Sequence, residues 1–163
     1  FIIYGDEDNI IFPANENSYV VQPRSIVSPP DGYTLVSSTN PRIKRYERQI
    51  NGVSTNDAYT YVYNKRGETI GVFESKYHIT ENEFIDMDHD VVRQTLERKM
   101  EEGLFEEPGI LNVSDYYLVL EGRPVPSKII EKEITDAEGN CSLDVKILNL
   151  LTGELISPEE VGL

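Results

Sequence analysis

An acidic run near the middle of the chain contains residue types that bind a cation. Its alternating carboxylates are Asp86, Asp88 and Asp90. This spacing matches the opening of a calcium-binding loop, and Glu97 stands at the twelfth position, where such a loop places its closing carboxylate. The sixth position is Val91, however, although the sharp turn of the loop requires glycine there. We therefore assign no metal ligand to this run. The acidic turn with Asp6 and Asp8 has the same ambiguity, and we assign no metal ligand there either.

No motif for nucleophilic, zinc or phosphate chemistry is present in the sequence. One cysteine and two histidines are too few for a zinc cluster of these residues at the usual spacing. No strand–nucleophile–helix elbow is found, and no glycine-rich segment continues into the Gly-Lys-Ser/Thr of a phosphate loop. Paired carboxylates could perform acid–base catalysis, but 29 acidic residues do not identify a pair. We therefore predict no catalytic residue, no metal and no cofactor, and an enzyme with paired carboxylates is our third hypothesis.

A short basic segment offers recognition chemistry instead. Within RIKRYERQI, which runs from residue 42 to residue 50, the cations are Arg42, Lys44, Arg45 and Arg48. Three roles are open to them: to protect a strand edge from pairing, to neutralise the protein's own acidic half, or to dock an acidic partner. The acidic half of a neighbouring copy would also serve as that partner, in a head-to-tail contact that generates rings or filaments.

The alternating tyrosines that follow are the second recognition element. Tyr59, Tyr61 and Tyr63 share one face of any strand that contains them, because strand side chains alternate. They form either an inner packing layer or a flat platform for a partner, since tyrosine adds contact area and a hydroxyl at little entropic cost. We assign partner binding to these three tyrosines together with the four cations.

The tyrosines belong to a predicted β-hairpin over residues 58–77. Its two extended runs flank residues 64–67, Asn-Lys-Arg-Gly, which are typical of a type I turn closed by a left-handed glycine. Placing Asn64 opposite Glu68 gives one aliphatic face and one aromatic face. The aliphatic face would hold Val62, Ile70 and Val72, and the aromatic face would hold the three tyrosines and Phe73. Both faces are apolar, so we expect this hairpin to be central in a sheet.

Two further elements are predicted on the N-terminal side of the hairpin. The Asn51-Gly52 pair is the usual primed hairpin turn, so residues 42–50 pair back onto residues 53–63 as a third strand. Residues 1–41 contain short apolar runs, among them 33–37, that prolines and turn residues interrupt. We predict that residues 1–41 are an irregular N-terminal arm or a set of edge strands, and that residues 42–163 are the core domain.

One principal helix is predicted within residues 81–102, most securely from His89 onward. Thr80-Glu81-Asn82-Glu83 matches a capping box, and Gly103 is a suitable stop. The expected buried stripe consists of Val92, Leu96 and Met100. The Asp86–Asp90 run could interrupt the helix, because aspartate competes locally with helical hydrogen bonding.

The C-terminal part of the chain is predicted to be strands. Residues 116–120, YYLVL, form a buried strand, and residues 122–126 form a linker. Residues 129–157 form a three-stranded meander. Its first loop is assigned four residues, which pairs Ile134 with Leu143, and its second turn sets Ile147 against Ile156.

The charge of the chain restricts its partners. The net charge is −14, and residues 58–163 carry most of it, with 10 basic and 22 acidic side chains and a balance of −12. A surface of this sign disfavours nucleic acid and anionic membranes, and no apolar run is long enough to span a bilayer. The same charge can steer the protein towards a basic protein.

The predicted fold is α+β, consisting mainly of antiparallel β hairpins and a meander, with one principal helix. We predict a non-enzymatic structural or assembly protein that contacts other protein chains, including copies of itself, in a larger particle such as a virion. The alternative is an acidic inhibitor or immunity-type protein that binds a basic nuclease or nucleic-acid enzyme. The sequence is compatible with a virion or with the cytoplasm.

Overall fold

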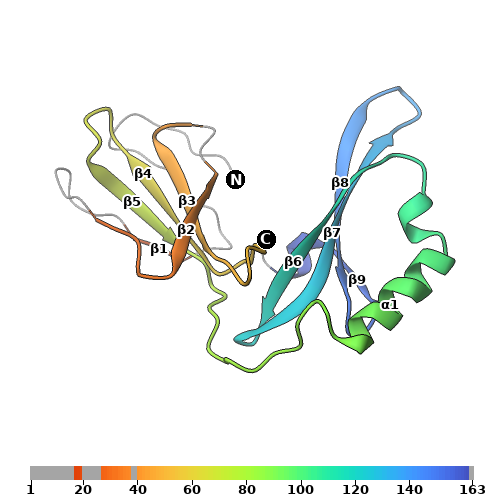
Figure 1. Cartoon of the computed structure of the whole chain (residues 1–163). Coiled ribbons are helices and arrows are strands. Elements are labelled where there is room, and N and C mark those ends of the chain that lie inside the picture. Colours follow the sequence, from red (N-terminus) through yellow and green to blue (C-terminus); the bar gives the residue numbers. More distant parts are fainter. Residues whose placement is uncertain (1–16, 20–26, 38–39, 162–163) are drawn as a thin grey trace. The chain divides into compact units, whose positions relative to one another are not determined.

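The computed structural model describes residues 17–19, 27–37 and 40–161 of the chain (Figure 1). Within this part the fold is α+β and mainly antiparallel β, with hairpins and one α-helix, as predicted. The strands form a five-stranded sheet in the order β1-β5-β4-β3-β2 and a four-stranded sheet in the order β6-β7-β8-β9. The chain divides into two compact units, residues 1–79 and residues 80–163, each built on one sheet.

The first unit contains the predicted tyrosine hairpin at the centre of its sheet. Its strands β1 to β5 are Asn17–Tyr19, Tyr33–Ser37, Ile43–Arg48, Ala58–Tyr63 and Thr69–Glu74. The β4–β5 turn has the predicted form: Gly67 has φ 81°, and the amide of Asn64 donates to the carbonyl of Glu68. The predicted Asn51-Gly52 turn is also confirmed, because both residues have positive φ, at 49° and 79°, and β3 pairs with β4.

The predicted register of the hairpin is wrong by one residue beyond the turn. A β-bulge between Val62 and Tyr63 places Tyr61 opposite Val72 and Thr60 opposite Phe73. Because side chains alternate along a strand, the extra residue exchanges the faces of Val72 and Phe73. Val62, Ile70 and Phe73 therefore form one buried cluster, while Val72 lies on the tyrosine side. The hairpin is nevertheless central in its sheet, as expected, although Tyr59 and Tyr63 of β4 are only half-buried.

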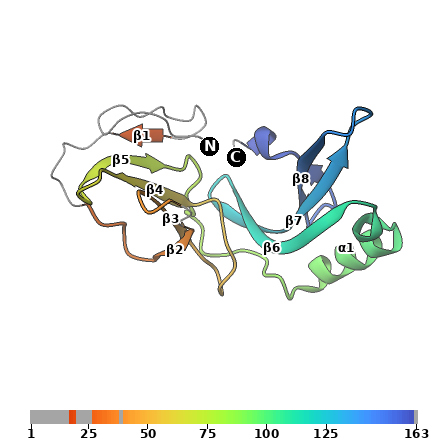
Figure 2. The same ribbon diagram turned by 90° about the horizontal axis from the view of Figure 1, so that it is seen from above.

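The predicted N-terminal arm contributes strands to the same sheet. β1 pairs with β5 and β2 pairs with β3, so both lie at the edges of the sheet (Figure 2). The domain boundary predicted at residue 41 falls between two paired strands of the first unit. The apolar runs at residues 1–4 and 10–12 lie outside the described residues.

The second unit packs one helix on one face of its sheet (Figures 1 and 2). Its strands β6 to β9 are Ile110–Leu120, Arg123–Thr135, Cys141–Asn149 and Leu155–Ile156, and α1 is Asp90–Glu101. Two short 3-10 helices are η1, Leu104–Glu106, and η2, Pro158–Val161. Val92 of α1 packs against Ile130, Leu148 and Leu150, while Ile147 and Ile156 belong to a second cluster with Tyr116 and Leu118.

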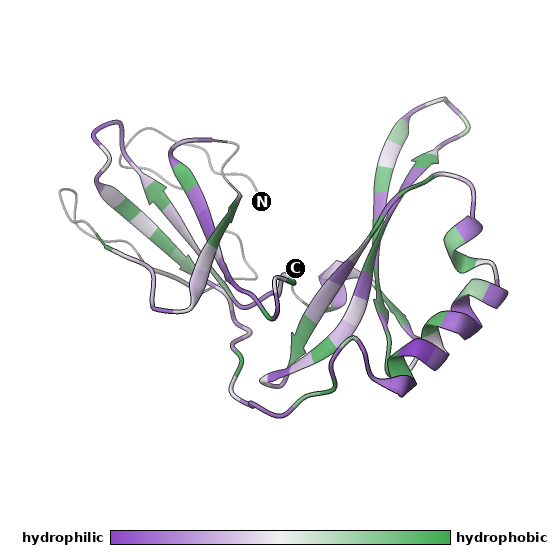
Figure 3. Cartoon of the chain, in the orientation of Figure 1, coloured by the Kyte–Doolittle hydropathy of each residue, from purple (hydrophilic) through white to green (hydrophobic). Residues whose placement is uncertain are grey.

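The helix is shorter than the predicted range. It begins at Asp90 and is capped by His89, whose Nδ1 accepts a hydrogen bond from the Val91 amide 3.1 Å away. The predicted capping box is not formed, because the amides of Thr80 and Glu81 donate to the carbonyl of Gly122 instead. Val92 is fully buried, but Met100 is 61% exposed, so the predicted stripe is wrong at its last position. Much of α1 is hydrophilic (Figure 3).

The residues predicted as a linker form the first part of β7. Glu121 and Gly122 have positive φ and make a tight turn between β6 and β7. Pro124 and Pro126 fit within β7 because their nitrogens face away from β6, and on that side the carbonyl of Pro126 still accepts a hydrogen bond from the Leu150 amide. The β7–β8 loop is one residue longer than predicted, since Asp136 accepts hydrogen bonds from the loop amides. Ile134 therefore lies opposite Ser142, whereas the predicted pairing of Ile147 with Ile156 is confirmed.

Candidate interaction surface

One face of the five-stranded sheet carries a layer of tyrosines. The ladders place Arg48 opposite Tyr33, Tyr46 opposite Tyr59, and Lys44 opposite Tyr61. Side chains that are directly opposite share a face of the sheet, so alternate positions of β2, β3 and β4 gather these rings. We call this surface the tyrosine face, defined by Tyr33, Tyr46, Tyr59, Tyr61 and Tyr63.

The rings of the tyrosine face contact one another mainly edge to face. Tyr33 and Tyr59 have ring centroids 4.9 Å apart at an interplanar angle of 79°, and Tyr46 and Tyr61 are 5.6 Å apart at 89°. Tyr61 and Tyr63 stack at 6.5 Å. Such arrangements bring the positive edge of one ring towards the negative face of another, and each contributes about 1 kcal/mol beyond the area it buries. The layer is therefore a rigid, mutually supported array.

Exposure differs across the tyrosine face. Tyr61, at the centre, is 1% exposed, and its hydroxyl lies 3.4 Å from the carbonyl oxygen of Ser28. The other four rings are half-buried, and the neighbouring Leu35 of β2 is 48% exposed. Burial and the nearby hydroxyl of Tyr46 raise the pKa of Tyr63 to about 12. The face thus has one buried ring that packs and a surrounding set of rings that reach solvent.

The four predicted cations do not share one surface. Lys44 and Arg48 lie on the tyrosine face, and the Lys44 ammonium sits 5.5 Å from the ring centroid of Tyr63, at cation–π distance. Arg45 lies on the opposite face, where its Nε is 3.1 Å from Glu47 Oε1. Arg42 precedes β3 and donates from Nε to the carbonyl of Tyr63 at 2.9 Å. β3 is an interior strand, so these cations do not protect a sheet edge.

A cluster of polar side chains around the buried Asp57 carboxylate borders the tyrosine face. Asp57 is 0% exposed, and its Oδ1 accepts from the Tyr33 hydroxyl at 2.6 Å and contacts His78 Nδ1 at 2.8 Å. The other ring nitrogen, Nε2, lies 2.7 Å from Glu74 Oε1, which also accepts from the Tyr59 hydroxyl at 3.2 Å. Burial and the Asp57 hydrogen bond raise the pKa of Tyr33 above its ordinary range. The cluster therefore joins β2, β4, β5 and the segment after β5.

The bonding of His78 decides what this cluster can do chemically. A histidine that acts as a general base needs one ring nitrogen free to take a proton from a nucleophile. Both nitrogens of His78 contact carboxylate oxygens, so neither is free for that role. The arrangement suits a structural link between Asp57 and Glu74 that fixes the edge of the tyrosine face.

Part of this surface is not predicted from the sequence. Tyr33 and Tyr46 are absent from the predicted set, although Tyr46 alternates with Lys44 and Arg48 in the basic segment, and that alternation is a usable signal. Asp57, Glu74 and His78 belong to no sequence motif. Their cluster depends on the pairing of strands that are separate in the sequence, which residue spacing does not reveal.

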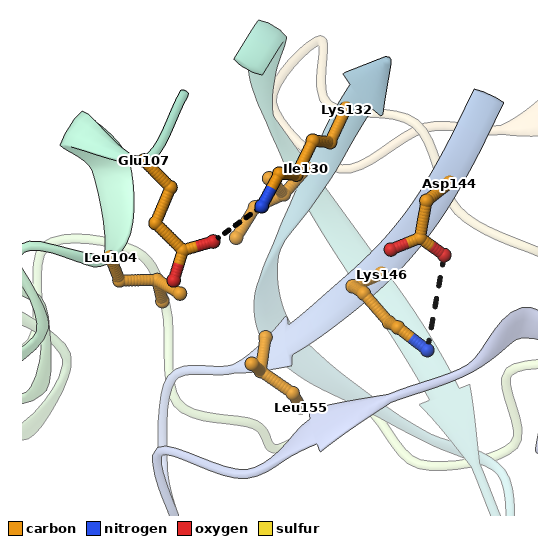
Figure 4. A pocket seen from close by; sticks show the side chains of 7 residues that line it. All are labelled: Leu104, Glu107, Ile130, Lys132, Asp144, Lys146 and Leu155. Atoms are coloured by element: carbon orange, nitrogen blue, oxygen red, sulfur yellow. Dashed lines mark hydrogen bonds and ion pairs between the residues drawn. The ribbon is translucent and has the colours of Figure 1, made fainter. Parts of the chain in front are cut away.

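The second unit has a shallow pocket of about 180 Å³ on the face that carries η1 (Figure 4). Leu104, Ile130 and Leu155 form its apolar wall. Its two lysines are both paired: Lys132 Nζ lies 3.0 Å from Glu107 Oε2, and Lys146 Nζ lies 2.8 Å from Ser157 Oγ and 4.0 Å from Asp144 Oδ1. A charged ligand would have to break these contacts, so the pocket offers no ready anchor for one.

The acidic run next to α1 forms a local turn. Asp86 Oδ1 accepts from the Asp88 amide at 3.0 Å, and Asp90 is the first residue of the helix. In the described part of the chain, no group of three or more His, Cys, Asp or Glu is placed to hold a metal ion. Nor does any described helix combine the length and apolar character needed to cross a bilayer.

Comparison of the chain with protein-family models, with curated proteins and with solved structures gives no match.

Proposed function

We propose that the chain is a non-enzymatic structural protein that binds other protein chains through its tyrosine face, within a larger particle such as a virion. The observation that carries the proposal is the partial exposure of this face. Four half-buried tyrosines lie beside Leu35, which is 48% exposed, and beside Lys44. Tyrosine is enriched at the centres of protein interfaces because it buries a large area while its hydroxyl stays compatible with water.

Several contacts support a binding role over a purely internal one. The rings hold one another in fixed orientations, and the Asp57–His78–Glu74 cluster fixes two of them through the hydroxyls of Tyr33 and Tyr59. A surface that is rigid before binding loses little side-chain entropy when a partner covers it. The near-neutral first unit, with 8 basic and 9 acidic side chains, also allows close approach without strong charge repulsion.

The test compares two exposed leucines in the two units. Leu35 lies on the tyrosine face, opposite Tyr46, whereas Leu111 lies in β6 of the second unit and is 60% exposed. We expect Leu35→Arg to reduce the recovery of co-purifying chains from the natural source by about tenfold or more, and Leu111→Arg to leave it unchanged. Circular dichroism of both variants checks that the fold is intact. Equal recovery with both variants, or a wild-type chain that stays monomeric and retains no partner, contradicts the proposal.

A second candidate function rests on the charge of the second unit. Residues 80–163 hold 7 basic and 20 acidic side chains, a balance of −13. An acidic inhibitor or immunity-type protein would use this unit to capture a basic nuclease or nucleic-acid enzyme. Its association rate should then fall steeply as ionic strength rises towards about 0.15 M, whereas binding through the tyrosine face should depend only weakly on salt.

A further inference from the structure

The β7–β8 hairpin extends past its neighbours in the second unit (Figure 1). β6 begins at Ile110, opposite Lys132, and the amide of Glu133 donates to the carbonyl of Gly109, so β7 pairs with β8 alone only beyond Glu133. β9 contains two residues and pairs only with Ile147 and Leu148. On the side of β8 that faces away from β7, residues 141–146 therefore have no strand partner in the described part of the chain.

The backbone groups on this open edge can be identified from the ladder. The amide of Asn149 donates to the carbonyl of Glu154, so odd-numbered residues of β8 direct their N–H and C=O groups away from β7. Cys141, Leu143 and Val145 thus present their backbone groups along the open edge. An edge of this kind is a template for another strand, and proteins usually protect it with charged side chains, proline, a bulge or a covering segment. Residues 141–146 contain no proline and no register shift, and their two charged residues, Asp144 and Lys146, lie on the opposite face from Leu143.

One face of the open edge is apolar, and its largest side chain, Leu143, is 56% exposed. Ile134 of β7 is 44% exposed but lies on the other face, opposite Ser142. Cys141, Leu143 and Val145 lie on the same face of β8, because they alternate. Asp144 is on the other face, where Lys132 of β7 lies directly opposite it.

We propose that this edge pairs antiparallel with the same edge of a second copy of the chain, with Leu143 opposite Leu143 of the second copy. In this register Cys141 lies opposite Val145 and Ser142 lies opposite Asp144, so apolar residues meet and no like charges are opposed. The two hairpins lie antiparallel, with the tip of each beside the base of the other. The combined sheet then has the strand order β7-β8-β8-β7.

Neighbouring registers are less favourable for physical reasons. Centring the two-fold axis on Asp144 would place two aspartates directly opposite each other, which is destabilising. Centring it on Val145 would require the outer side of Ile147, which β9 already occupies. Centring it on Ser142 shortens the ladder, because its outer pair would fall on Gly139 in the loop. The Leu143 register is therefore the longest one without a charge conflict or a blocked strand.

A symmetric disulfide tests this register directly. Opposite residues of a hydrogen-bonded antiparallel pair have Cα atoms about 5.5 Å apart, within the range that a disulfide spans. In a Cys141→Ser background of the full chain, we expect Leu143→Cys to give a covalent dimer under mild oxidation. The matched control is Ser142→Cys in the same background, whose side chain lies on the other face, opposite Asp144 of the second copy, and which should stay monomeric. The natural Cys141 should also stay uncrosslinked, because the two Cys141 residues would lie roughly 13 Å apart along the strands.

A second measurement does not depend on cysteine chemistry. Sedimentation of the wild-type chain should show a monomer–dimer equilibrium, and Leu143→Lys should weaken dimerisation about tenfold or more by opposing two cations and removing an apolar contact. Lys65→Glu, in an exposed turn of the first unit, serves as a control and should not change the dimer. A wild-type monomer at every concentration, or crosslinking at residue 142 as efficient as at residue 143, overturns the proposal. The edge shares no residue with the tyrosine face, so that outcome would leave the proposed function standing.

Discussion

The antiparallel sheets of the two units are covered by different kinds of side chain. In the second unit, an aliphatic cluster seals one sheet face beneath α1, and the charge balance of residues 80–163 is −13. In the first unit, one sheet face is covered by tyrosines and bordered by the polar cluster around Asp57, and the balance of residues 1–79 is −1. Aliphatic residues favour complete burial, whereas tyrosines keep hydroxyls at the boundary with water. The difference separates a strongly acidic unit with an aliphatic core from a near-neutral unit that carries half-buried tyrosines, with Lys44 and Arg48 among them, on one sheet face.

The largest expected effect concerns the aliphatic core of the second unit. Leu148 is fully buried beneath Val92 of α1, so Leu148→Ala should lower the free energy of unfolding of this unit by about 4 kcal/mol. Leu111→Ala, in β6 of the same sheet and 60% exposed, is the matched control and should cost less than about 0.5 kcal/mol. Denaturant unfolding, with hydrogen exchange of the β7–β8 amides, measures both. Similar losses of unfolding free energy in the two variants would show that the burial of Leu148 beneath α1 does not stabilise this unit.

The next prediction tests whether the first unit depends on its polar cluster. Asp57→Ala should destabilise this unit by about 3 kcal/mol, because it leaves His78 and the Tyr33 hydroxyl without their buried acceptor. The control is Glu68→Ala, since Glu68 is a half-buried carboxylate in the β4–β5 turn and is remote from the cluster. Hydrogen exchange of the β4 and β5 amides reports the loss. A cost no greater than that of the control would mean that the tyrosine face does not rely on this cluster.

Two glycines with nearly equal φ angles, one in each unit, allow the turns of the two units to be compared. Gly67 has φ 81° and open space where a Cβ would stand, whereas Gly122 has φ 82° and its Cβ would overlap Thr80 Oγ1. Gly67→Ala should cost about 1 kcal/mol from backbone strain alone, and Gly122→Ala should cost about 1 kcal/mol more, because Thr80 must move. Thermal unfolding measures the two costs. Equal costs would indicate that Thr80 moves aside freely.

The smallest expected effect is the response of the tyrosine face to alkali. The unfolded chain ionises Tyr63 near the ordinary pKa of about 10, whereas in the folded chain the pKa is about 12. The contribution of this pKa shift to the stability of the folded chain is therefore complete below pH 10 and is lost as the pH rises towards 12. Tyr63→Phe should remove this part of the pH dependence of the free energy of unfolding, which a series of denaturation curves between pH 9 and pH 12 would detect. An unchanged slope in the variant would assign the loss to other groups.

Local signals predicted the elements of the fold well. Asn64–Gly67 and Asn51-Gly52 specify their turns through residues that tolerate positive φ, so these hairpins could be recognised without any long-range information. The pairing of Ile147 with Ile156 also followed from the apolar pattern. Predictions failed where one extra residue changed a register, at the bulge beside Val62 and in the Asp136 loop, because a bulge has no reliable sequence signature.

The tyrosine face could be predicted only in part. Tyr59, Tyr61 and Tyr63 share a face by simple alternation, but the burial of Tyr61 depends on the Ser28 segment that contacts it. The distribution of the four cations over two faces follows from the phase of β3, which its ladders to β2 and β4 fix. Long-range pairing thus decides which side chains a partner could reach, and spacing alone does not contain that information.

Pro124 and Pro126 limit where a further strand could pair with the sheet of the second unit. They occupy positions of β7 whose backbone nitrogens face away from β6, and Leu150 lies on that side, where its amide donates to the carbonyl of Pro126. A proline has no hydrogen to offer an incoming strand, so the sheet is closed to extension at this end. Residues 141–146 at the far end of the same side have no such block. Pairing of residues 141–146 with the same edge of a second copy uses that edge in both chains, so this association would stop at a pair and would not propagate into a fibre.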